Sequence, residues 1–248
     1  MHCDLSPGCT NWNRLRDDTP LLLQLDKRQR TCAVTAGINW KGLSSKPPES
    51  ISRYPIPYKK DLPYDIVELM EEVETKGGFL PNVFKVLAHR PSEFRAFFAY
   101  YNALMNKDTG RLTKADRELI VVASSIHNRC LYCVVSHSAL HRIYSKNPTL
   151  ADQVIVNYET AELDPRQHAM LDFALAVCRS DTITDEDFQR LEAHGFDRED
   201  AWDIGAIAAF FAMSNRLAHV TGMRPNAEFY GMGRTPRDKA QSGQEDSA

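Results

Sequence analysis

Four side chains between positions 118 and 137 are of types that carry out thiol and acid–base chemistry. Cys130 and Cys133 form a CxxC pair, His137 follows four residues later, and Glu118 lies twelve residues before the pair. On a helix, side chains three, four and seven residues apart stack on one face. The spacing therefore predicts that two thiols and one imidazole lie side by side.

The chemistry of such a group depends on where the helix begins. If it begins near Cys130, both sulfurs lie at its N-terminal end, where unpaired amides and the helix dipole favour the thiolate. His137 could then hydrogen-bond the Cys133 sulfur or take its proton, with Glu118 orienting the imidazole as the third member of a relay. A thiolate so placed suits attack on a peroxide O–O bond, and the sulfenic acid formed would condense with Cys130 to a disulfide.

Two other interpretations of the same residues stay open at this point. Cys130, Cys133 and His137 are soft ligands at CxxCxxxH spacing, so they could bind zinc, with His127 or Glu118 as the fourth ligand. Alternatively, the cysteines are an accidental pair of buried core residues, since free cysteine behaves as a small hydrophobe. A thioredoxin fold is disfavoured, because no β-strand pattern precedes the CxxC.

The elements that must position these residues are helices. No segment alternates with period two between hairpin turns, and every long apolar pattern repeats at three to four residues, which predicts an all-α fold of about eight to ten helices. Thr113 to Asp116 and Asp164 to Gln167 resemble helix starts. Glu118 is expected on a helix ending near His127, with a break at 128–129 and the next helix at 130–145. An aromatic stripe at 94–101 is expected in the core.

The domain organisation follows from proline, charge and periodicity. Residues 1–50 lack periodicity and are expected to form a disordered extension, residues 51–234 the folded domain, and residues 235–248 a flexible tail. Residues 51–62 read as an extended arm, which would lie on a partner subunit or on its own domain. The 248 residues are 43% hydrophobic and 25% charged, with net charge −3, as in ordinary globular proteins. This balance predicts no nucleic-acid partner and no membrane partner.

The six cysteines do not have the dense, regular spacing of a secreted disulfide scaffold. A reducing compartment fits better, and we expect a cytoplasmic protein. The basic residues of the first 30 positions leave a mitochondrial presequence as the alternative, although transit peptides are poor in the acidic residues present here.

The pattern Glu118–x11–Cys130–x2–Cys133–x3–His137 resembles that of the alkylhydroperoxidase AhpD/carboxymuconolactone decarboxylase superfamily. Longer blocks resemble its branch of peroxidase-related enzymes: ISRYPIP, GGFLPNVFKVLAHRPSEFRAFFAYYNALM, RCLYCVVSHSALHR, ADQVIVNY and MRPNAEFYGMGR. The resemblance covers about residues 51–234.

This resemblance implies an AhpD-like helical bundle that assembles as a homo-oligomer and reduces hydroperoxides without haem, flavin or metal. It implies that Cys133 is the peroxidatic cysteine, that Cys130 resolves it and exchanges with an external dithiol reductant, and that Glu118 and His137 relay protons. One position departs from the family, because well-studied AhpD proteins have a histidine between the cysteines where this chain has Tyr132. A redox-sensing or scaffolding oligomer without turnover is the non-enzymatic alternative.

Several further residues are weaker candidates. His141 continues the His137 face but is expected on the helix surface, and Cys178 on an apolar face is expected to be buried. Nothing in the sequence places Arg216 or His219 near the cysteines. A two-residue echo, Asn128-Arg129 and Asn215-Arg216, follows two apolar helices and is too short to interpret.

Overall fold

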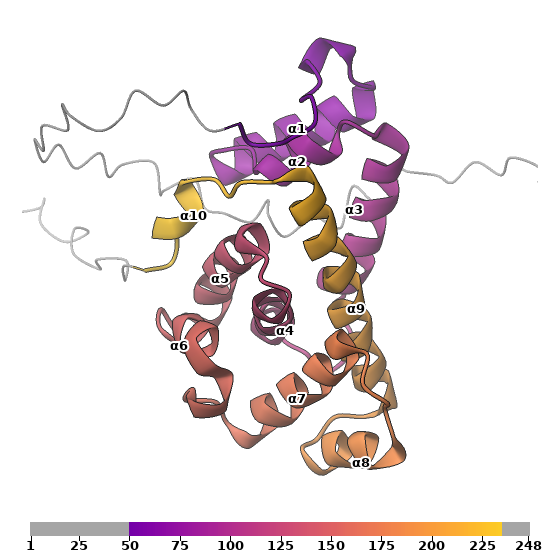
Figure 1. Ribbon diagram of the computed structural model, residues 1–248, viewed down its shortest axis with the longest axis vertical. Helices are drawn as coiled ribbons and strands as arrows, with labels where there is room; N and C mark the ends of the chain where they lie inside the picture. Colours follow the sequence, from indigo (N-terminus) through magenta and orange to yellow (C-terminus); the bar gives the residue numbers. More distant parts are fainter. Residues whose placement is uncertain (1–49, 235–248) are drawn as a thin grey trace, which may run out of the picture.

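The computed structural model describes residues 50–234, and within them it contains helices and no strand (Figure 1). The expected all-α fold is therefore confirmed. The helices are α1 (Tyr64–Gly77), α2 (Asn82–Leu87), α3 (Pro91–Met105), α4 (Lys114–His127), α5 (Leu131–Ser145), α6 (Leu150–Asn157), α7 (Pro165–Arg179), α8 (Asp185–Ala193), α9 (Arg198–Thr221) and α10 (Glu228–Gly231), with short 3-10 turns at Lys59–Asp61 and Tyr158–Thr160.

Helix α4 forms the centre of the fold. In Figure 1 it is seen end-on, surrounded by α5, α6, α7 and α9, and all four of these helices pack against it. Every residue from Asp116 to Ser125 is buried, so the helix is enclosed on all sides rather than along one stripe. Glu118, the carboxylate of the predicted relay, therefore lies in the interior of the fold.

The first three helices form a smaller layer beside this centre. Phe84 of α2 stacks on Phe98 of α3 with ring centroids 4.3 Å apart, and Phe94 lies 4.6 Å from Phe98. Phe97 continues the contact to Phe210 of α9 at 4.9 Å. The aromatic stripe thus packs in the core, as expected, and joins the two layers of the molecule.

Helix boundaries follow local capping chemistry. Thr113 and Asp116 form a reciprocal capping box at the start of α4, and Asp164 and Gln167 form another at the start of α7, as the sequence predicts. Helix α5 begins at Leu131, with Cys130 as its N-cap, one residue later than expected. The capping box at Thr113 therefore fixes the start of α4, the helix that carries Glu118.

The expected arm at residues 51–62 packs on its own domain. The Arg53 backbone N–H donates to the Thr221 carbonyl at 2.6 Å, and the Arg224 N–H donates to the Ile51 carbonyl at 3.3 Å. These bonds tie the arm to the C-terminal end of α9.

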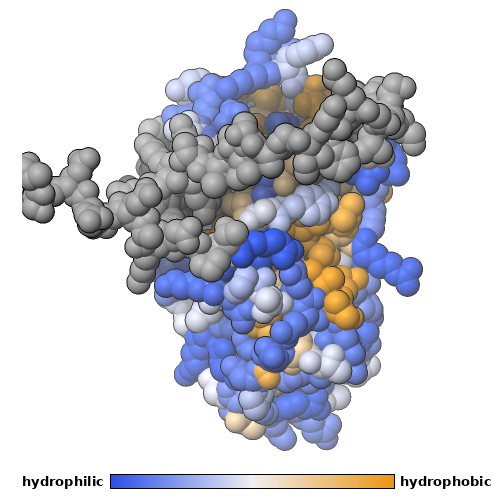
Figure 2. Space-filling model, turned by 90° about the vertical axis from the view of Figure 1, so that its left-hand side faces the viewer, coloured by the Kyte–Doolittle hydropathy of each residue, from blue (hydrophilic) through white to orange (hydrophobic). Residues whose placement is uncertain are grey.

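The expected disordered extension and flexible tail lie outside the described residues, apart from Ser50, as does the possible presequence, and these expectations stay predictions. Among residues 50–234, no helix combines the length and apolar character required to cross a bilayer. The face in Figure 2 is largely hydrophilic, and its most prominent group of apolar side chains lies at the middle right.

Candidate active site

The turn between α4 and α5 positions the CxxC pair. The Arg129 N–H donates to the Ile126 carbonyl and the Cys130 N–H donates to the Ser125 carbonyl, each at 2.9 Å, which closes the last turn of α4. Arg129 adopts a left-handed conformation with φ 56°, the geometry that commonly ends a helix. The chain therefore reverses within three residues, and α5 runs back along α4.

This reversal brings the predicted carboxylate and imidazole into contact. His137 Nδ1 lies 2.6 Å from Glu118 Oε2, and both residues are buried. The imidazole also packs edge-on against Phe211 with centroids 4.8 Å apart. Because Nδ1 is taken by the carboxylate, Nε2 is the nitrogen left to act as acid or base. The contact fits the expected dyad, whose catalytic role stays a prediction.

Both cysteines of the pair are buried free thiols. Hydrogen bonding from the Cys133 thiol lowers the pKa of Cys130 to about 6, and the Cys133 backbone N–H acts in the same direction. The same hydrogen bond to Cys130, together with burial, raises the pKa of Cys133 well above its usual range. The hydrogen bond between the two sulfurs therefore favours the negative charge on Cys130, at the helix N-terminus, over Cys133.

Helix α9 supplies polar partners that the sequence did not assign to the site. Asn215 is fully buried, accepts from Asn128 Nδ2 at 3.0 Å and donates to Ser125 Oγ at 3.0 Å. Hydrogen bonding from Asn215 lowers the pKa of both thiols, and His219 further lowers the pKa of Cys130 by its charge. The repeated Asn-Arg pair was the one feature of the sequence that could have identified Asn215, since Asn128 and Asn215 hydrogen-bond to each other in the structure.

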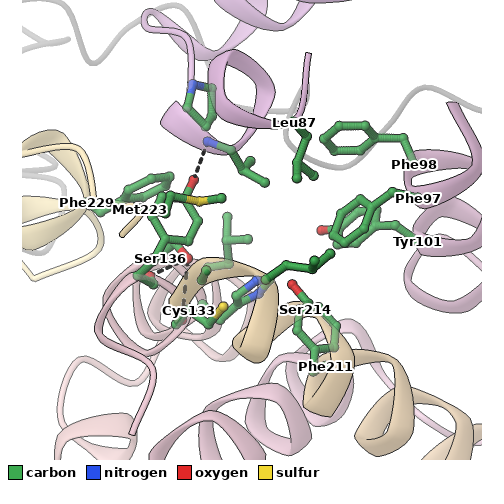
Figure 3. Close-up of a pocket in the computed structure, with 17 residues that line it drawn as sticks. Leu87, Phe97, Phe98, Tyr101, Cys133, Ser136, Phe211, Ser214, Met223 and Phe229 are labelled. Atoms are coloured by element: carbon green, nitrogen blue, oxygen red, sulfur yellow. Dashed lines mark hydrogen bonds between the residues drawn. The ribbon is translucent and has the colours of Figure 1, made fainter. Parts of the chain in front are cut away.

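A small enclosed space, here called the inner pocket, lies beside Cys133. Its volume is about 40 Å³, enough for a few water-sized groups. Figure 3 shows Cys133, Ser136 and Ser214 on one side of it and Leu87 and Phe98 opposite. Apolar and aromatic side chains form most of the remaining wall, and His137 completes it. The pocket can hold a small reactant beside one thiol and one imidazole.

A second space, here called the outer cavity, has Cys130 in its lining rather than Cys133. Its volume is about 490 Å³, and Tyr132 is among the residues that border both spaces. Cys133 therefore lines one space and Cys130 the other, and Tyr132 borders both.

Comparison with known proteins identifies the family of the chain. The model of the carboxymuconolactone decarboxylase family matches residues 91–176, a range that contains all four predicted site residues. A crystal structure from Ralstonia eutropha JMP134, described as the alkylhydroperoxidase AhpD core of an uncharacterized peroxidase-related protein, is 60% identical, and the match covers 77% of this chain and 100% of that chain with a TM-score of 0.75. This chain belongs to the AhpD/carboxymuconolactone decarboxylase superfamily.

Two more solved structures are similar to this AhpD-like chain. An uncharacterized peroxidase-related protein from Silicibacter sp. TM1040 is 39% identical, covering 77% of this chain and 100% of that chain with a TM-score of 0.71. The apo debrominase Bmp8 is 19% identical, covering 73% of this chain and 95% of that chain with a TM-score of 0.59, and it shares the fold. No protein with a curated description matches the chain significantly.

Tyr132, where this AhpD-like chain departs from the family pattern, has a structural partner. Its buried hydroxyl accepts a hydrogen bond from the Val83 backbone N–H at 3.1 Å. Val83 lies in the first turn of α2, whose N-cap, Pro81, offers no side-chain hydrogen bond. Tyr132 therefore ties the CxxC turn to the helix that covers the inner pocket.

The weaker candidate residues lie in different environments in the structure. His141 is buried, so its expected surface position was wrong; α6 and α10 both pack on α5. Burial lowers the pKa of His141 to about 4, which keeps the ring neutral at pH 7. Cys178 is buried as expected, with its sulfur 3.1 Å from Asn128 Nδ2. Arg216 is exposed and donates to the Ala212 carbonyl of its own helix.

The zinc interpretation lacks a ligand set. His127 is exposed on the last turn of α4, and Glu118 is engaged with His137. Among residues 50–234, no three histidine, cysteine, aspartate or glutamate side chains form a group that could hold a metal ion. The described geometry therefore favours thiol chemistry at the pair.

Proposed function

We propose that the chain is a CxxC-dependent thiol peroxidase that reduces small hydroperoxides in the inner pocket. The observation that carries this proposal is the placement of Cys133 and His137 on the wall of one small, mostly apolar compartment, with the buried Glu118 carboxylate bound to the imidazole. The buried carboxylate holds the imidazole, so the proton acceptor is positioned before the substrate enters.

In the proposed first step, His137 Nε2 takes the proton of the Cys133 thiol. The Cys133 thiolate then attacks the outer oxygen of the hydroperoxide, the O–O bond breaks, and the alkoxide leaves as an alcohol after taking the proton from His137. Cys133 becomes a sulfenic acid. The raised pKa of the Cys133 thiol explains why this sulfur requires a base beside it.

In the second step, Cys130 attacks the Cys133 sulfenic acid, forming the disulfide and expelling hydroxide, which is protonated to water. The lowered pKa of Cys130 supports this role, because the resolving sulfur is already a thiolate at neutral pH. An external dithiol then reduces the disulfide and becomes a disulfide itself, which returns both cysteines to thiols.

The proposal includes assembly as a homo-oligomer. Helix α9 exposes Trp202, Met213 and Val220 on one side, at helical spacing. Exposed apolar side chains aligned in this way commonly mark a protein interface.

The decisive experiment is stoichiometric. Reduced protein receives less than one equivalent of a hydroperoxide, the thiols lost are counted, and the disulfide is mapped by peptide mass. The proposal expects two thiols lost per peroxide and a Cys130–Cys133 link. Steady-state turnover with a dithiol donor is the second measurement, since a redox-sensing oligomer would form the same disulfide without sustained peroxide consumption.

A further inference from the structure

The outer cavity has a cationic lining that the proposed peroxide chemistry does not use. Arg53, Arg129 and Arg224 come from three separate segments, and His219 adds a fourth basic side chain. No aspartate or glutamate is among the residues that line it. The whole chain has a net charge of −3, so the basic lining is a local property, of the kind that concentrates anions in a cleft.

Arg53 is held in the wall of this cavity by backbone contacts. Its guanidinium donates to the His219 carbonyl at 2.6 Å and to the Val220 carbonyl at 3.3 Å, at the C-terminal end of α9. A Cβ atom at Gly222, whose φ is +66°, would come within 3.2 Å of the Arg53 side chain. The arginine therefore packs closely against Gly222, with its guanidinium held at the end of α9.

Arg129 occupies a position where arginine is costly. A left-handed conformation disfavours residues with a Cβ, and glycine or asparagine would adopt it more easily. Arg129 has φ 56° directly before Cys130, and its side chain is exposed to the cavity that contains the thiol. Residues held in such conformations cluster at functional sites, which indicates a use for this charge.

The dimensions of the site restrict what can reach Cys130. The cavity volume of about 490 Å³ lies in the range of small-molecule sites. Cys130 itself is only 1% exposed, so a thiol held on a flat protein surface would not reach its sulfur. A donor must therefore approach this sulfur from within the cavity that Cys130 lines.

We propose that the outer cavity is the reductant site, and that its occupant is a small thiol donor carrying an anionic group such as a carboxylate. This inference rests on the thiol peroxidase function proposed above. It assigns substrate and reductant to different compartments, with the peroxide at Cys133 and the donor at Cys130.

The Cys130–Cys133 disulfide would be reduced at this site in two thiol–disulfide exchange steps. The donor thiolate attacks the Cys130 sulfur of the disulfide, the S–S bond breaks, and Cys133 leaves as a thiolate that takes a proton through His137. A second thiol, from the same donor or another molecule, then displaces Cys130 from the mixed disulfide. The donor is oxidised to its disulfide, and both protein cysteines are reduced.

The test uses 3-mercaptopropionate and its neutral amide, 3-mercaptopropionamide, as matched probes. The full-length protein is oxidised with diamide, so that disulfide preparation does not depend on peroxidase activity. The rate of disulfide reduction is measured for each probe and divided by that probe's rate with neutral 2,2′-dipyridyl disulfide, which removes differences in intrinsic thiol reactivity. We expect the normalised rate to be about fivefold to tenfold higher for the carboxylate at low salt, and the ratio to fall as salt rises.

Variants test whether the side chains of the outer cavity cause the preference for the carboxylate probe. Arg129→Asn keeps a residue that tolerates the left-handed turn, and Arg53→Met removes the second charge, with Arg53→Lys retaining it. The carboxylate-to-amide ratio should fall about fivefold in the first two and persist in Arg53→Lys. Arg216→Gln, which removes an α9 charge outside the cavity lining, should leave the ratio unchanged. Acid-quenched mixed disulfide should map to Cys130.

Each outcome decides one claim. A ratio near one in the unmodified protein, a ratio that Arg129→Asn and Arg53→Met both leave high, or a mixed disulfide on Cys133 would overturn the reductant site. Failure of a limiting hydroperoxide to form the disulfide would instead overturn the peroxidase proposal, and the diamide-oxidised protein would still report on the cavity.

Discussion

The Nδ1 atom of His137 lies 2.6 Å from the Oε2 atom of Glu118, between two helices that meet at the centre of the fold. The second carboxylate oxygen, Oε1, is buried and has no hydrogen-bond partner among the described residues. Among the described residues, the Glu118 carboxylate therefore hydrogen-bonds only to His137. A carboxylate in this setting orients the imidazole and stabilises its protonated form when His137 accepts a proton.

Replacing His137 tests the proposed base. His137→Ala should slow the reaction of reduced protein with hydroperoxide by about 100-fold to 10,000-fold at pH 7, because the Cys133 thiol would lose its proton acceptor. Glu118→Gln retains the size of the side chain without its charge and should cause a smaller loss. Stopped-flow measurement of peroxide consumption gives both rates. An unchanged rate in His137→Ala would remove the imidazole from the mechanism.

The two cysteines should fail at different steps. Cys133→Ser is expected to abolish peroxide consumption, whereas Cys130→Ser should undergo one oxidation and then stop at the sulfenic acid, which a dimedone adduct of Cys133 detects by mass. Cys178→Ser serves as the control, since Cys178 is buried away from both spaces. Equal, full turnover in both CxxC variants would contradict the assignment.

The pH dependence of alkylation reports on the lowered pKa of Cys130. The reaction of Cys130 with iodoacetamide, followed by peptide mass, should rise through about pH 6 and then level off, because the thiolate reacts and the thiol does not. Cys133→Ala removes the hydrogen bond that contributes most to this shift, so the inflection should move up towards the ordinary cysteine value. An inflection already at that ordinary value in the unmodified protein would refute the charge distribution described here.

The hydroxyl of Tyr132 should contribute to stability. Tyr132→Phe leaves the buried Val83 N–H without its partner, and we expect the free energy of unfolding to fall by about 1–3 kcal/mol. Urea denaturation measures this difference. Tyr100→Phe is the matched control on α3, where the side chain is half exposed and little change is expected. Equal stabilities for Tyr132→Phe and the unmodified protein would show that the bond is dispensable.

The apolar side of α9 should determine the oligomeric state. Met213→Glu places a charge in the proposed interface and should lower the molar mass measured by light scattering to that of a single chain. Val156→Glu on α6, which replaces a residue 86% exposed outside that side, should leave the mass unchanged. A single-chain mass in the unmodified protein would end the proposal of a homo-oligomer.

Local patterns predicted the helices and the contact between Glu118 and His137. The capping boxes at Thr113 and Asp164 marked the helix starts, and the spacing of Cys130, Cys133 and His137 placed these residues on one helix face. Asn215 could not be assigned in the same way, because it reaches the sulfurs from a helix some eighty residues further along the chain. Burial of His141 was missed for a related reason, since the periodicity of α5 does not reveal what α6 and α10 cover.

The two layers of the fold are expected to differ in how readily their helices open. Glu118 lies on α4, which is enclosed on all sides, whereas the opposite wall of the inner pocket includes α2, a six-residue helix held by the stacking of Phe84 on Phe98 and by a few polar contacts. In hydrogen exchange, α4 amides should be among the last to open and α2 amides among the first. Small openings of α2 would then admit a hydroperoxide while the acid–base pair stays assembled, so entry and proton transfer rely on parts of different local stability.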